Sequence, residues 1–193
     1  MKKLLFVPVA LALVAPLSLC ATNLTSRANA QAPTMVSSTS EPIALLTKDW
    51  YHYTAKDSSY SALFPGQPQE SVQSDSVQVL YADFTNNHAY MTRIVKLHTK
   101  INQNDVEKIL DAMITKALDG NTLIDQKKIN RQGLPGREFT IRGLKGDLKG
   151  LVAKMQVFIN PFESSLYLTM VGGQNVDFPE AQAFLDSVSI AKK

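Results

Sequence analysis

GLPGREFTIRG, at residues 133–143, is the stretch of the sequence that decides the fold. A glycine-rich loop beside basic residues can hold a phosphate group, but such loops need a helix that begins directly after the glycines. Here Gly136 is followed by Arg137 and by alternating apolar and polar residues, which is a strand pattern. Pro135 and Gly136 suit the central positions of a type II turn, with Gly136 at positive φ. The stretch predicts a turn that leads into a strand with one solvated face.

Further strands are predicted on both sides of this stretch. The segments are rich in β-branched and aromatic residues and are separated by short polar turns. The expected strands are residues 50–54, 60–64, 123–129, 137–142, 151–160 and 166–171, a hairpin made by SVQVLYADFT and HAYMTRIVKLH, and a small edge strand in the closing VSI. The segment FPGQP ends the strand at 60–64, because proline cannot donate a hydrogen bond to a ladder. In the strand 151–160, Lys154 and Gln156 are expected to face away from the apolar set.

Two helices are predicted. The first opens with Asn104 three residues before Glu107, a capping-box spacing, and Gly120 supplies a left-handed stop. Its apolar residues recur at helical spacing: Val106, Ile109, Leu110, Met113, Ile114, Ala117 and Leu118. The second opens with Asp177 as cap and Pro179 in the first turn, and ends near Ser187 with Ala181, Phe184 and Leu185 on one side. Strands with short turns, and helices with one apolar face, predict an α+β domain with an antiparallel sheet.

The N-terminus has the order of charges and apolar residues that is typical of a secretory signal peptide. Lys2 and Lys3 precede an apolar run from Leu4 to Leu19. A retained membrane anchor is the alternative, but the run is short for a bilayer, and Pro8 and Pro16 interrupt it. We therefore expect residues 1–30 to be a signal peptide and the protein to be exported.

Two processing sites compete within this leader. The small residues at 28–30 favour cleavage after Ala30, so that the mature chain begins at Gln31. The alternative is lipidation of Cys20, although Leu19 is bulkier than the residue that usually precedes a lipidated cysteine. Residues 31–45 are rich in Ser, Thr and Pro and are expected to form a flexible linker. Residues 46–193 then form a single α+β domain.

The mature chain has no net charge that would favour binding to nucleic acid. The leader holds three of the 20 basic residues and none of the 17 acidic residues, so the mature chain carries 17 of each. A chain without net charge and without a basic segment has no footprint for nucleic acid or for an anionic membrane. Cys20 is the only cysteine, so the folded domain is expected to hold no disulfide, thiol nucleophile or thiolate metal site.

Residues that could take part in catalysis or metal binding are scattered along the chain. His52, His88 and His98 lack metal-ligand spacing; a weak surface site for a cation at His88 and Asp83 is the alternative. No serine lies in a G-x-S-x-G nucleophile elbow. The sequence therefore predicts no catalytic, cofactor-binding or metal-ligating residue, and no enzyme activity.

Two further segments have an alternative reading as binding sites. The loop GLKGDLKG could hold an anion through Lys145 and Lys149, but Asp147 cancels part of that charge and a solvated hairpin loop is favoured. The aromatic residues of WYHY, at 50–53, could bind a sugar or a partner, but alternate aromatics are expected to fill the core.

Several of these motifs together resemble a known family. Trp50 with YSALFPGQP, GLPGREFTI, SLYLTMVGG and FLDSVSI is similar to the PsbP-like fold family, small exported proteins of photosynthetic bacteria. The resemblance spans residues 48–190 and implies an antiparallel sheet sandwiched between helices. The fold is shared with PsbP, an extrinsic subunit of photosystem II that helps to retain calcium and chloride, and with a nuclear Ran-binding protein. No cofactor-binding residue of PsbP matches a residue of this chain, so that role is not transferred.

Together these observations predict an exported, non-enzymatic accessory or binding protein of the periplasm or thylakoid lumen. Its partner is expected to be a protein, in a photosynthetic or envelope membrane complex. Membrane contact is expected only if Cys20 is lipidated or the leader is retained. The alternatives are an exported hydrolase or metal-dependent enzyme with an unrecognised site, and an assembly factor anchored through Cys20.

Overall fold

The computed structural model of the protein describes residues 47–118, 120–143 and 149–191. The expected signal peptide at 1–30 and linker at 31–45 lie outside the described residues, as do Lys145 and Asp147 of the GLKGDLKG loop. Within the described ranges no helix is long and apolar enough to cross a membrane.

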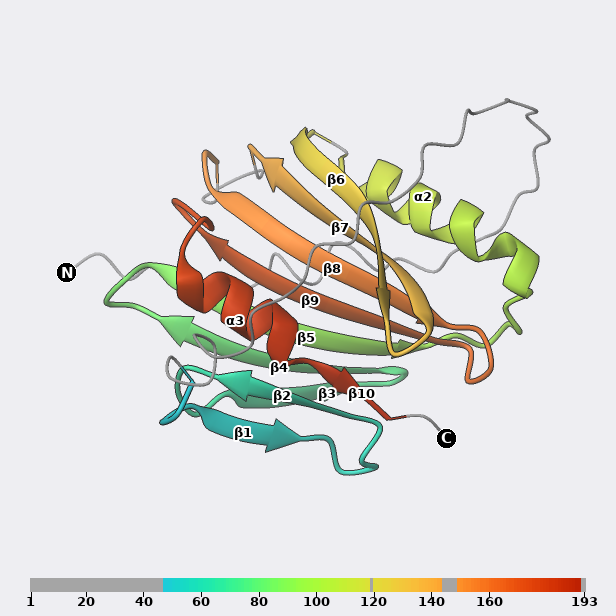
Figure 1. The fold of residues 1–193 in the computed structure, drawn as a ribbon, viewed down its shortest axis with the longest axis horizontal. Coiled ribbons are helices and arrows are strands. Elements are labelled where there is room, and N and C mark those ends of the chain that lie inside the picture. Colours follow the sequence, from blue (N-terminus) through green and yellow to red (C-terminus); the bar gives the residue numbers. More distant parts are fainter. Residues whose placement is uncertain (1–46, 119, 144–148, 192–193) are drawn as a thin grey trace.

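The described residues form two antiparallel sheets and two α-helices (Figure 1). The larger sheet has seven strands in the order β3-β4-β5-β9-β8-β7-β6, and the smaller has three in the order β1-β2-β10. The seven are β3 (Gln69–Gln73), β4 (Ser76–Asp83), β5 (His88–Lys96), β6 (Thr122–Arg131), β7 (Leu134–Arg142), β8 (Val152–Asn160) and β9 (Ser165–Gly173). The three are β1 (Tyr51–Thr54), β2 (Tyr60–Phe64) and β10 (Ser189–Ile190). The α+β class and the antiparallel pairing expected from the sequence are confirmed.

Different layers cover the two faces of the large sheet. Helix α2 (Val106–Ala117) packs on one face, where Leu110 and Ile114 belong to the same buried cluster as Phe139 of β7. Helix α3 (Pro179–Ser187) lies on the other face and shares it with the three-stranded sheet (Figure 1). Helices alone therefore do not form the second layer, because β2 and β10 contribute to it.

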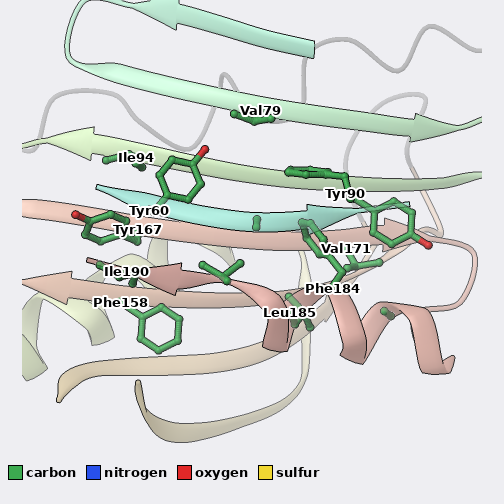
Figure 2. Close-up of a cluster of buried hydrophobic side chains, with 14 of the residues drawn as sticks. Tyr60, Val79, Tyr90, Ile94, Phe158, Tyr167, Val171, Phe184, Leu185 and Ile190 are labelled. Atoms are coloured by element: carbon green, nitrogen blue, oxygen red, sulfur yellow. The ribbon is translucent and has the colours of Figure 1, made fainter. Parts of the chain in front are cut away.

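The core beneath α3 is rich in aromatic rings. Figure 2 shows Tyr60, Phe184 and Leu185 reaching from β2 and α3 toward the large sheet. The rings of Phe64 and Phe184 lie 5.0 Å apart, and the Tyr60 hydroxyl lies 2.9 Å from the Thr92 hydroxyl inside the core. The predicted apolar side of the second helix is thus confirmed. The edge strand predicted at VSI is also confirmed: it is β10, which pairs with β2.

The turn predicted at Pro135 and Gly136 is wrong. The β6–β7 hairpin turns instead at Gln132 and Gly133, whose φ angles are 53° and 86°. Two central residues at positive φ match the twist of hairpin strands, and the Asn130 side chain supports the turn by accepting a hydrogen bond from the Gly133 amide at 3.0 Å. Pro135 and Gly136 therefore lie inside β7, and Gly136 has no positive φ.

Gly136 is required for packing. A Cβ atom at this position would meet the Val157 carbonyl oxygen at 2.5 Å and a ring carbon of Phe158 at 2.6 Å. The missing side chain lets Phe158 lie against the backbone of β7, where it is fully buried.

The solvated face predicted for residues 137–142 is also wrong. Glu138 and Thr140 are only 6% and 7% exposed, and Arg137 on the opposite face is 5% exposed. Arg137 donates to Glu107 at 2.6 Å and to Asp111 at 3.0 Å on α2. The hydrogen bonds that Glu107 accepts from Arg137 and Lys128 lower its pKa to about 2. Strand β7 lies inside the sheet with layers on both faces, so Arg137 and Glu138 are buried in ion pairs, while Arg142 at the end of the strand is exposed as expected.

A similar correction applies to β8. Lys154 and Gln156 face away from α2, as expected, but they enter the layer below α3 instead of solvent. Gln156 is 2% exposed and donates to Glu138 at 2.7 Å, while Lys154 donates to Gln182 of α3 at 3.0 Å.

The helix ends differ from the predicted caps. A 3₁₀ turn at Gln103–Asp105 precedes α2, and Asn102 accepts a hydrogen bond from the Asn104 amide at 3.0 Å. The predicted capping box of Asn104 and Glu107 is therefore not the cap of α2, although Gly120 has the expected positive φ of 78°. Phe178, not Asp177, occupies the cap position of α3, with Pro179 in the first turn as expected.

Strand β3 was not predicted. All five of its residues are exposed and four of them are polar, so the segment lacks the alternation that identifies a half-buried strand. It forms because its backbone pairs with β4 along the whole of its length.

Replacing Gly136 with alanine tests the packing role of this glycine. We expect Gly136→Ala to lower the free energy of unfolding by about 1 to 3 kcal/mol, because the added methyl group overpacks a buried site. Chemical unfolding followed by circular dichroism measures the change. Gly172→Ala is the matched control, since its Cβ would meet only the Val152 carbonyl oxygen, at 3.9 Å. Equal stability of the two variants would contradict this role.

Candidate interaction surface

A cluster of aromatic rings surrounds Tyr90 at the end of the large sheet where β4 turns into β5. Tyr90 itself is 2% exposed. Ring centroids of Trp50, Tyr81 and His88 lie 6.4, 6.0 and 6.5 Å from that of Tyr90. Phe178 stacks on His88 at 4.1 Å with an angle of 10° between the rings. We call the four partly exposed residues Trp50, Tyr81, His88 and Phe178 the aromatic rim.

Phe84 lies in the β4–β5 turn, between the strand that carries Tyr81 and the strand that begins at His88. Its side chain is 70% exposed, which is unusual for a phenylalanine. The turn is held by Asp83, whose carboxylate accepts hydrogen bonds from the Thr85 amide at 3.0 Å and from the Asn86 side chain at 2.8 Å. Burial opposes ionisation of Asp83, but hydrogen bonds from Asn86 and Thr85 outweigh it, so the pKa of this carboxyl lies below its usual value. The exposed ring thus sits on an ordered turn.

Two glycines place rings of the aromatic rim. A Cβ on Gly66, in the FPGQP segment, would meet the Tyr81 ring at 2.5 Å. A Cβ on Gly173, at the end of β9, would meet the His88 ring at 2.7 Å and the Asn87 carbonyl oxygen at 3.0 Å. Backbone therefore supports Tyr81 and His88 directly, without an intervening side chain.

The histidines considered as metal ligands lie apart. His88 and His98 are at opposite ends of β5, where His88 stacks on Phe178 and His98 lies 2.9 Å from the Asp75 carboxylate. His52 is exposed on β1. Asp83 pairs with His88 in the ladder, but its carboxylate is engaged by the turn. In the three described ranges, no group of three or more His, Cys, Asp and Glu residues is placed to hold a metal ion.

The WYHY segment divides between core and surface. Tyr53 packs against Tyr60 and Phe64, at ring distances of 5.6 and 6.3 Å. Its hydroxyl donates to Glu70 of β3 at 2.5 Å, which joins the edges of the two sheets. Tyr51 is 43% exposed, and Trp50 belongs to the aromatic rim.

Most of the aromatic rim could not be found from the sequence. Of its residues, only Trp50 and His88 were considered as binding groups, each in a different context. The contact between His88 and Phe178 joins β5 to the start of α3, far along the chain, and Tyr81 looks like an ordinary strand residue. The available signal was the pair of glycine motifs, FPGQP and VGG, which mark close approaches of backbone.

The chemistry of this surface suits binding. Partly exposed aromatic side chains are enriched at protein interfaces and carry much of the binding energy there. The rings are backed by the core through Tyr90, whose ring lies 5.3 Å from that of Phe184. The surface therefore offers a firm apolar area with polar groups at its border.

Comparison with known proteins defines the class of fold. No family model matches the sequence, and no curated protein matches it at a significant level. Solved structures do match, and they show that the fold is PsbP-like, as the sequence motifs predicted.

The particular structures are distant in sequence. The solution structure of cyanobacterial PsbP (CyanoP) from Synechocystis sp. PCC 6803 is 12% identical, covers 74% of this chain and 92% of its own, and has a TM-score of 0.51. The Saccharomyces cerevisiae Ran-binding protein Mog1p is 6% identical, covers 74% of this chain and 95% of its own, and has a TM-score of 0.47. At these identities the comparison shows the fold alone.

Replacing Gly173 with alanine tests how the aromatic rim is built. We expect Gly173→Ala to push His88 off Phe178, because the added Cβ lies between the His88 ring and fixed backbone. In proton NMR spectra, His88 ring protons that are shielded by Phe178 should move toward their unshielded positions. The neighbouring variant Gly172→Ala should leave them unchanged. Unaltered His88 signals in Gly173→Ala would show that this glycine does not position the ring.

Proposed function

We propose that this chain is a non-enzymatic binding protein that docks a protein partner on the aromatic rim and Phe84. The observation that carries the proposal is the 70% exposure of Phe84 in the turn that joins the strands of Tyr81 and His88, two rings that glycines hold in place. An exposed large apolar side chain next to a firm aromatic area is the arrangement of an interface anchor.

The turn structure supports this role. Burying Phe84 against a partner would remove its apolar surface from water, and the ordered Asp83 turn already holds its backbone. Docking of a partner needs no catalytic group on this chain. The proposal therefore agrees with the position of the histidines on separate elements.

We also propose a compartment for the protein, from the pattern of its leader. The signal-peptide pattern supports export to the periplasm or thylakoid lumen, with cleavage after Ala30, a linker at 31–45 and the domain from residue 46. The resemblance of the sequence motifs to the PsbP-like family, which includes an extrinsic subunit of photosystem II, supports a partner in a photosynthetic membrane complex; an envelope membrane complex is the alternative. The linker would then let the domain reach a partner at the membrane surface.

The processing step has a direct test. When the full chain is expressed in a bacterium that exports it, we expect a mature protein that begins at Gln31 and carries no lipid. Intact-mass spectrometry of the purified protein measures both properties. A mass that corresponds to a chain lipidated at Cys20 would contradict cleavage after Ala30 and show that the protein is anchored to the membrane.

Partner capture tests the docking surface. Immobilised protein is used to capture proteins from detergent-solubilised native membranes, and the captured proteins are quantified by mass spectrometry. We expect Phe84→Ser to reduce the captured amount of the specific partner by about tenfold or more, because the variant lacks an interface anchor.

Phe162→Ser is the matched control for this capture. Phe162 is also highly exposed, at 83%, but lies in the β8–β9 turn at the opposite end of the sheet. We expect it to capture the same partner as the parent protein. Equal loss in both variants, or no specific partner for the parent, would contradict the proposed function.

A further inference from the structure

The surroundings of the aromatic rim are acidic, although the mature chain is expected to have no net charge. Asp83 faces His88 across the β4–β5 ladder, and Glu180 lies in the first turn of α3, two residues after Phe178. Asp49 and Asp177, both exposed, directly precede Trp50 and Phe178. Lys48 is the basic residue next to this group in the sequence. The same end of the sheet also carries the exposed basic residues Arg142 and Lys149, where β7 ends and β8 begins, but β9 separates these strands from β5. The negative charge is therefore local to the surroundings of the aromatic rim.

Tyr90 connects the aromatic rings to the carboxylates. Burial raises the pKa of the Tyr90 hydroxyl, and the charges of Asp83 and Glu180 raise it further, so the hydroxyl stays protonated. Figure 2 shows this hydroxyl directed away from the other labelled side chains of the core. Tyr90 itself is buried, so the groups that a partner can reach here are the rings of the aromatic rim and the carboxylates beside them.

We propose that the aromatic rim binds an arginine side chain in a basic segment of the protein partner. This inference rests on the proposed function and specifies the chemistry of its partner. A guanidinium group is attracted by the faces of Trp and Tyr rings and forms charge-assisted hydrogen bonds with carboxylates. Trp50 and Tyr81 supply the rings, and Glu180 supplies a carboxylate.

Arginine fits this combination better than lysine does. The planar guanidinium stacks on an aromatic ring while its edge donates to a carboxylate, and it is more weakly hydrated than an ammonium group. Lysine presents a point charge that is strongly hydrated and cannot stack. An anionic ligand, such as a phosphate group, would be repelled by the same carboxylates.

Trp50 provides a direct probe of this site, because it is the only tryptophan of the chain. We would titrate the isotope-labelled exported protein with a short Gly-Ser peptide that carries arginines, and follow the Trp50 indole N–H signal by NMR. Peptides with lysine or glutamate in place of arginine serve as comparison probes. We expect a saturable shift with the arginine peptide, weaker binding of the lysine peptide, and no shift with the glutamate peptide.

Charge variants test the role of the carboxylate. Glu180→Gln should lower the affinity for the arginine peptide about threefold, which is the effect of losing one exposed charge pair. Asp125→Asn changes the net charge equally and is the control, because Asp125 lies on β6, four strand spacings and roughly 19 Å from Tyr90. It should leave the affinity unchanged. Asp83 is not a suitable position, since its carboxylate also holds the β4–β5 turn.

The possible outcomes separate this inference from the proposed function. An equal response to the glutamate peptide, or unchanged affinity in Glu180→Gln, would overturn the arginine assignment. If Phe84→Ser abolishes partner capture while the arginine peptide leaves the Trp50 signal unmoved, the docking role stands and the arginine assignment is wrong. If the peptide binds but capture does not depend on Phe84, the arginine site stands and docking through Phe84 is wrong.

Discussion

Burial of both faces of the central strands of the seven-stranded sheet is the constraint on which the rest of this structure depends. Strands β8 and β9 are buried at almost every position, so their side chains must be matched by a layer on each side. Helix α2 forms one layer and brings Glu107 and Asp111 to Arg137. The other layer combines α3 with a small sheet, and its core ends at Tyr90.

This two-sided burial explains which features the sequence could predict. Strand and helix positions follow from apolar periodicity, and α3, β10 and most strands of the large sheet lie where that periodicity placed them. Periodicity alone cannot tell a solvated charged residue from a buried pair. Glu138 therefore looked like a solvent-facing residue, although it is buried beside the opposite charge of Lys127.

Turns and edges show a second limit. Pro-Gly is a strong local turn signal, yet the β6–β7 hairpin turns at Gln132 and Gly133 because pairing of Arg131 with Leu134 sets the register. Strand β3 gave no signal, since an edge strand exposed on both faces can be polar throughout. The aromatic rim was beyond prediction for a different reason: its contacts join residues that only the tertiary fold brings together.

The glycines behind the rings have a thermodynamic consequence. A side chain that is free to rotate in the unbound protein loses conformational entropy when a partner fixes it. Tyr81 and His88 are confined before any partner arrives, because Gly66 and Gly173 bring backbone against them. Most of that ordering has therefore taken place during folding, and a partner of modest size can be held by a surface that is already in its bound shape.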